Sequence, residues 1–99
     1  MFKIVYAEGV ADDLAKLTAY RRKAIFNAIE KQLQYEPNVE TRHRKKLPGL
    51  IPPWEHVLPV WELRIDEDRV FYDVDETEET VKIRAVRHKP PHKTTEEIV

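Results

Sequence analysis

The chain has 99 residues, of which 41% are hydrophobic and 35% are charged, and its formal net charge is −1. This length supports a single domain over residues 1–99, and the near-neutral charge excludes a general nucleic-acid binder that relies on total charge. The lack of cysteine excludes disulfides and thiolate metal sites. Because no apolar stretch is long enough for a signal peptide or a membrane span, we expect a cytoplasmic protein with no membrane partner.

The first third of the chain predicts a strand followed by two helices. Residues 2–7 alternate between apolar and other side chains, which is typical of a short strand. Apolar residues recur at i, i+4 and i+7 from Val10 and predict a first helix. Thr18 is the predicted N-cap of a second helix with one apolar stripe, and Pro37 ends that helix.

The next segment is basic and rich in proline. Residues 41–54 contain four Lys or Arg and no acid, whereas residues 76–79 form an acidic run. We expect most of residues 38–59 to be a loop that brings cations to the rim of a sheet. These cations are Arg42, Arg44, Lys45 and Lys46.

Residues 61–89 alternate at period two and predict three antiparallel strands, joined by a turn at Asp66-Glu67 and a loop over residues 76–79. The register keeps apolar side chains opposite apolar ones. The predicted opposite pairs are Leu63–Val70, Trp61–Tyr72, Arg64–Arg69, Val74–Val81, Tyr72–Ile83, Asp73–Lys82 and Phe71–Arg84. The predicted buried face carries Trp61, Leu63, Ile65, Val70, Tyr72, Val74, Val81, Ile83 and Ala85.

These elements predict an α+β domain. An N-terminal strand and a helical hairpin precede an antiparallel three-stranded meander, and the helices pack on one face of one twisted sheet. We expect the first strand to pair within that sheet. The tail after Pro90-Pro91 is either a final turn or disordered.

The other face of the predicted sheet gathers cations. Arg64 and Arg69 lie directly opposite each other in the register, where like charges repel. One interpretation is that they bind an anion, and the alternative is a solvated face with Glu62 and Asp73 as counter-ions. The side chains predicted on this face are Glu62, Arg64, Arg69, Phe71, Lys82, Arg84 and His88.

Three segments together resemble the RelE/ParE superfamily of toxins from type II toxin–antitoxin systems: RHRKKLPG, WELRIDEDRVFYDVDE and VKIRAVRHK. The resemblance extends over nearly the whole chain and implies a cognate antitoxin, within a toxin–antitoxin hetero-oligomer. RelE-like members cut mRNA in the ribosomal A site, whereas ParE-like members inhibit DNA gyrase. We favour the RNA-cleaving activity. The alternatives are gyrase inhibition and a catalytically inactive binding member of a toxin–antitoxin complex.

The resemblance also implies roles for particular residues in a metal-independent reaction, in which the ribose 2′-OH attacks the adjacent phosphate. Arg69 matches the arginine that contacts phosphate in RelE-like nucleases, and Arg64 lies beside it. His88-Lys89 matches a late basic pair, in which His88 would be the proton donor. Lys45 and Lys46 match the segment that grips RNA, so the candidate RNA-binding residues of this segment are Arg42, Arg44, Lys45 and Lys46. Arg84 adds a further cation.

Two roles in this reaction remain open in the sequence. The general base is either Glu62 or a lysine, Lys45 or Lys46. The tail lacks the aromatic residue that RelE-like nucleases often carry, so Phe71 is the candidate for stacking on a base. The four histidines do not show the spacing of a metal site, and we expect no metal and no cofactor.

Overall fold

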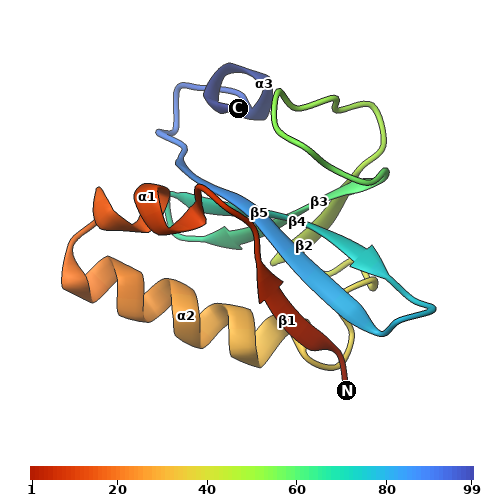
Figure 1. Cartoon of the computed structure of the whole chain (residues 1–99). Helices are drawn as coiled ribbons and strands as arrows, with labels where there is room; N and C mark the ends of the chain where they lie inside the picture. Colours follow the sequence, from red (N-terminus) through yellow and green to blue (C-terminus); the bar gives the residue numbers. More distant parts are fainter.

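A twisted five-stranded sheet lies at the centre of the molecule, in the order β1-β5-β4-β3-β2 (Figure 1). The computed structural model describes residues 1–99. β1 is parallel to β5 and the other neighbours are antiparallel. The elements are β1 (Lys3–Tyr6), α1 (Val10–Ala15), α2 (Ala19–Leu33), β2 (Arg44–Leu47), β3 (Val60–Ile65), β4 (Asp68–Asp75), β5 (Thr80–His88) and α3 (Thr95–Ile98). The predicted α+β class and the place of the first strand in the sheet are confirmed.

The basic run contains a strand that the sequence did not predict. Arg44–Leu47 forms the edge strand β2, antiparallel to β3, inside the segment that we expected to be mostly loop. Its sequence RKKL has no apolar alternation, so the pairing depends on β3 and not on local preference. Charged side chains on a short edge strand also protect it from pairing with other chains.

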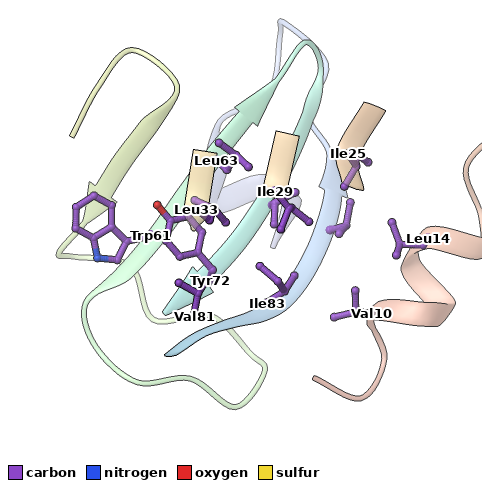
Figure 2. Close-up of a cluster of buried hydrophobic side chains, with 12 residues drawn as sticks. Val10, Leu14, Ile25, Ile29, Leu33, Trp61, Leu63, Tyr72, Val81 and Ile83 are labelled. Carbon is purple, nitrogen blue, oxygen red and sulfur yellow. The ribbon is translucent and has the colours of Figure 1, made fainter. Parts of the chain in front are cut away.

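The main hydrophobic core lies between the sheet and the helices α1 and α2 (Figure 2). Ile25, Ile29 and Leu33 recur every four residues along α2 and are fully buried against the sheet. Thr18 caps α2 as predicted, because its side chain accepts a hydrogen bond from Arg21 N. No helix of the molecule is long and apolar enough to cross a bilayer.

Tyr72 connects this core to the end of α2. Its ring stacks on Trp61 with centroids 6.1 Å apart, and its hydroxyl donates a 2.7 Å hydrogen bond to the Pro37 carbonyl. Burial raises the pKa of the Tyr72 hydroxyl far above its ordinary value of 10.0. The phenol is therefore held in its neutral, hydrogen-bonded form.

This pKa shift predicts a loss of stability in alkali. Above pH ~10 the unfolded state releases the Tyr72 proton while the folded state keeps it, so the free energy of unfolding falls by up to about 1.4 kcal/mol per pH unit. In Tyr72→Phe this contribution is absent, so the variant loses less stability than the wild type between about pH 9 and about pH 11, on either side of the ordinary tyrosine pKa of about 10. Urea denaturation at each pH measures the difference. Equal slopes for the two proteins would contradict the assignment.

The predicted register is confirmed for six of the seven pairs and wrong for one. A β-bulge in the β4–β5 pairing lies next to Phe71 and Tyr72, so Phe71 pairs with Ala85 and not with Arg84. Arg84 is the extra residue of β5. Because a bulge shifts the side-chain alternation by one position, every residue of β5 after Arg84 points to the face opposite to the predicted one.

A second, smaller core covers the other face of the sheet. Leu50, Val60, Phe71 and Ala85 are buried there, and Trp54, Ile98 and Val99 pack against them. The loop over residues 48–59 and α3 form this layer, on the opposite side of the sheet from α2 (Figure 1). The prediction that Ala85 belongs to the main core is therefore wrong, and Val86 takes that place.

Candidate functional site

Two arginines on the second face of the sheet meet at one buried carboxylate. Arg64 and Arg69 are opposite each other, as predicted. Arg64 Nε donates a 3.0 Å hydrogen bond to Glu62 Oε1, and Arg69 Nε lies 4.0 Å from the same oxygen. The carboxylate of Glu62 compensates the repulsion between the two guanidinium groups.

The C-terminal helix α3 closes this cluster from above. Thr95 Oγ1 donates a 3.1 Å hydrogen bond to Glu62 Oε2, so both oxygens of Glu62 are engaged. The Glu62 side chain is 1% exposed, whereas that of Arg64 is 43% exposed. In this structure Arg64 is the member of the cluster that solvent and a ligand can reach.

Arg69 has a second set of contacts that support the hairpin turn. Its Nη1 donates to the carbonyls of Asp66 and Asp68, at 2.7 and 2.9 Å. Its Nε is buried and forms no hydrogen bond. Arg69 therefore combines a structural role with an unused donor directed at the cluster.

Exposed cations continue from this cluster onto the neighbouring edge strand. Lys45 is paired with Glu62 in the sheet, and Lys46 lies with its Nζ 6.0 Å from the centre of the Trp61 ring. Lys45, Lys46 and Arg42 are exposed, and none of them forms an ion pair. We call the set of Arg42, Lys45, Lys46 and Arg64 the basic edge.

Arg44 belongs to the same basic run but is used inside the protein. Its Nε donates to the Val39 carbonyl at 3.0 Å, and its Nη1 donates to the Gln32 carbonyl at 2.6 Å. The side chain is buried and ties β2 to the end of α2. The expectation that Arg44 faces RNA is therefore not met in this structure.

Two further predicted RNA-binding residues are also occupied within the protein. Arg84 Nε donates a 2.8 Å hydrogen bond to Asp73 Oδ2, and Asp73 also accepts from the backbone N–H of Val57. Phe71 is 0% exposed, and its ring centre lies 5.3 Å from that of Trp54. Asp73 thus acts as a counter-ion, and Phe71 cannot stack on a base while the loop and α3 cover it.

His88 lies on the opposite face of the sheet from Arg69, so the prediction that they share one face is wrong. The bulge places Arg87 opposite Arg69 and His88 opposite Asp68. His88 Nδ1 lies 3.4 Å from Arg21 Nη2, while its Nε2 lies 3.7 Å from Glu67. Lys89 follows it, and its backbone N–H donates to the Glu67 carbonyl at 2.6 Å.

Sequence reasoning missed two arginines beside His88. Arg21 forms a two-pronged ion pair with Asp68 through Nε and Nη2, and this hydrogen bonding raises the pKa of Arg21. Arg87 Nη1 donates a 2.8 Å hydrogen bond to Asp13 Oδ2. The signal for Arg21 was a cation in the first turn of a helix, where the helix dipole disfavours it unless a carboxylate compensates.

A scan of protein-family models and a search of curated proteins both find no match for the sequence. Among solved structures, the architecture is that of small α+β toxins from toxin–antitoxin complexes. RelE of the RelBE2 complex from Mycobacterium tuberculosis is 24% identical with a TM-score of 0.69, over 89% of this chain and 98% of that chain.

Two further structures agree with this result. RelE of the RelE–RelB complex from Pyrococcus horikoshii OT3 is 21% identical with a TM-score of 0.69, over 94% of this chain and 98% of that chain. The isolated E. coli RelE toxin is 16% identical with a TM-score of 0.62, over 98% of this chain and 94% of that chain. The protein has the RelE fold.

Proposed function

We propose that this protein is the toxin of a type II toxin–antitoxin system and that it inhibits translation by cutting mRNA in the ribosomal A site. The observation that carries the proposal is a RelE fold that presents the basic edge next to the Glu62 cluster. Four exposed cations on one rim of a near-neutral protein, three of which form no ion pair, favour a polyanionic ligand.

Arg64 is the residue best placed to bind the scissile phosphate. Glu62 holds its Nε and leaves both Nη groups free to form a two-pronged contact with phosphate oxygens. Lys45 is adjacent across the strand pair and would neutralise further charge. In this step the 2′-oxygen forms a bond to phosphorus while its proton passes to water, and the bond from phosphorus to the 5′-oxygen breaks as water returns a proton to that oxygen. Arg64 and Lys45 would stabilise the charge that develops on the phosphorane.

The other predicted catalytic residues divide into two groups. Arg69 stays in the proposed site behind Glu62, where its free Nε faces the same carboxylate. His88 and Lys89 are left out of the step at Arg64, because His88 lies across the sheet. Glu62 is poorly suited to act as the base, since both its oxygens already accept hydrogen bonds.

We also propose that a cognate antitoxin binds this protein. The structures from M. tuberculosis, P. horikoshii and Methanococcus jannaschii are all complexes of a RelE toxin with its antitoxin. An acidic antitoxin segment that orders on the basic edge would block the access of RNA. Coexpression with the product of a small neighbouring reading frame is expected to restore growth.

Expression of the protein alone is expected to arrest growth and to produce cuts in translated mRNA, detected by primer extension. The Arg64→Ala variant is expected to lower the cleavage rate about 10²-fold, because one donor to the developing charge is lost. Lys23→Ala is the matched control, since Lys23 is an exposed cation on α2 outside the basic edge.

A DNA supercoiling assay with purified gyrase distinguishes RNA cleavage from the alternative activity, gyrase inhibition. Intact mRNA together with inhibited supercoiling would reject RNA cleavage in favour of gyrase inhibition. Intact mRNA without growth arrest would leave only a binding role in a toxin–antitoxin complex. Cleavage that is unchanged in Arg64→Ala would remove the proposed site but not the proposed activity.

A further inference from the structure

A small cavity lies between α2 and the end of β3, next to Arg64 of the basic edge. It has a volume of about 290 Å³ and is lined by residues of α2, by His43 before β2, and by residues 64–66. We propose that this cavity, named the α2 cavity, binds one nucleobase of the RNA whose phosphate lies at Arg64. The base site therefore rests on the proposed function and adds a place where the RNA sequence is read.

Arg64 connects the α2 cavity to the Glu62 cluster. Its Nε donates to Glu62, and the same residue forms part of the cavity wall. The backbone N–H of Arg64 donates a 2.8 Å hydrogen bond to the His43 carbonyl, so these two residues lie side by side. A nucleotide with its phosphate at the Arg64 guanidinium group would therefore have the cavity within reach of its base.

The lining suits a flat heterocycle with two apolar faces. Ala28 and Ile65 are half-buried and supply apolar surface. His43 and Arg64 supply an imidazole and a guanidinium group, which are planar groups of the kind on which unstacked RNA bases lie. The His43 imidazole forms no hydrogen bond or ion pair within the protein, so it is free for this contact.

Three polar side chains of the lining also have no partner within the protein. They are the amide of Asn27, the ammonium group of Lys31 and the carboxylate of Asp66, and all three residues are exposed. Of Asp66 only the backbone carbonyl is used, by Arg69. The free groups include both donors and acceptors, and the polar edge of a base requires both.

The charges in and around the cavity favour a base over a simple anion. Two cations and one carboxylate line it, namely Lys31, Arg64 and Asp66. The next residues of the turn, Glu67 and Asp68, add carboxylates on the side of Asp66. A free phosphate in the cavity would be repelled by these carboxylates, whereas a neutral base can accept from Lys31 and donate to Asp66 at the same time.

The volume of the cavity limits the ligand to a base without its sugar. Small-molecule sites begin at about 300 Å³, and the α2 cavity lies at that lower limit. The ribose and the phosphate would remain outside, at the basic edge. Because single-stranded RNA is read when a base turns out of its stack, Asn27 and Asp66 would determine which base is preferred.

An NMR titration of the isotope-labelled, full-length protein with each of the four nucleoside 5′-monophosphates tests this proposal. Ribose 5-phosphate is the control ligand, because it has the same sugar and phosphate but no base. At least one nucleotide is expected to shift the backbone amides of residues 27–32, 43 and 65–66 in a saturable manner, while ribose 5-phosphate leaves them unchanged. Saturable shifts of these amides by ribose 5-phosphate would overturn the base site.

Two variants of α2 test the contacts with the base. Asn27→Ala and Lys31→Gln are each expected to weaken binding of the preferred nucleotide about three- to fivefold, because each removes one exposed hydrogen-bonding group. Lys3→Gln is the matched control, since it removes an exposed cation from β1, at the opposite edge of the sheet, and should bind as the wild type does. The proposal is overturned if no nucleotide gives saturable shifts, or if all three variants bind equally.

The titration needs neither a ribosome nor cleavage, so it separates this proposal from the proposed function. Cleavage of mRNA without nucleotide shifts at these residues would reject the α2 cavity alone. Nucleotide binding in the cavity by a protein that cuts no mRNA would reject the proposed activity and support the base site.

Discussion

Replacement of Phe71 by alanine is expected to lower the free energy of unfolding by about 3–5 kcal/mol. Phe71 is 0% exposed and contacts the second core, with its ring centre 5.3 Å from that of Trp54. Truncation would remove the apolar area of the ring and leave a cavity under the loop and α3. For a domain of this size that is a large part of the total stability.

Equilibrium unfolding in urea, followed by circular dichroism, measures this loss. Tyr20→Ala is the control, because Tyr20 is 84% exposed and its truncation should change stability by no more than about 0.5 kcal/mol. A similarly small effect of Phe71→Ala would show that the second face is solvated, as in the simpler sequence interpretation. In that case the loop and α3 would not cover the sheet in solution.

The second large effect concerns Arg44, for which we expect Arg44→Met to cost about 2–3 kcal/mol of stability. Methionine keeps much of the apolar stem but removes the guanidinium group, so the carbonyls of Gln32 and Val39 lose their buried donors. The side-chain hydrogen bonds that join β2 to the end of α2 and to the segment after it would then be lost.

Lys45→Met is the matched control for this prediction, since Lys45 is the next residue, is exposed and has no partner. We expect its stability to remain within about 0.5 kcal/mol of the wild type, while its affinity for RNA falls. The folded fraction of Arg44→Met should bind RNA as the wild type does. The opposite result, with weaker RNA binding and unchanged stability in Arg44→Met, would show that Arg44 binds RNA, as the sequence predicted.

The local pattern of the chain predicts much of the fold for physical reasons. Side chains alternate between the two faces of a strand, so the pairing of Leu63 with Val70 and of Val74 with Val81 follows from matching apolar positions. Thr18 satisfies the first backbone donors of α2 within its own segment. Such features need only neighbouring residues or one hairpin.

The candidate site was predicted less accurately than the fold, because its geometry depends on one inserted residue, Arg84. Period-two alternation carries no sign that Arg84 is bulged, yet this residue moves Ala85 to the second core and His88 to the helix side. For that reason the prediction that His88 and Arg69 lie on the same face of the sheet was wrong. Arg64 and Arg69 were placed correctly, because the hairpin that contains them has no bulge.

By itself the sequence determined the order of β1, the helices α1 and α2 and the strands β3 to β5, the register of the β3–β4 hairpin and the presence of a basic segment, since each depends on residues close together in the chain. Only the tertiary structure decided which cations are free: Arg44 is buried against α2, Arg21 is paired with Asp68, and Lys45 remains exposed. The physical reason is that the partner of a charge is set by segments distant in sequence. A list of charges does not contain that information.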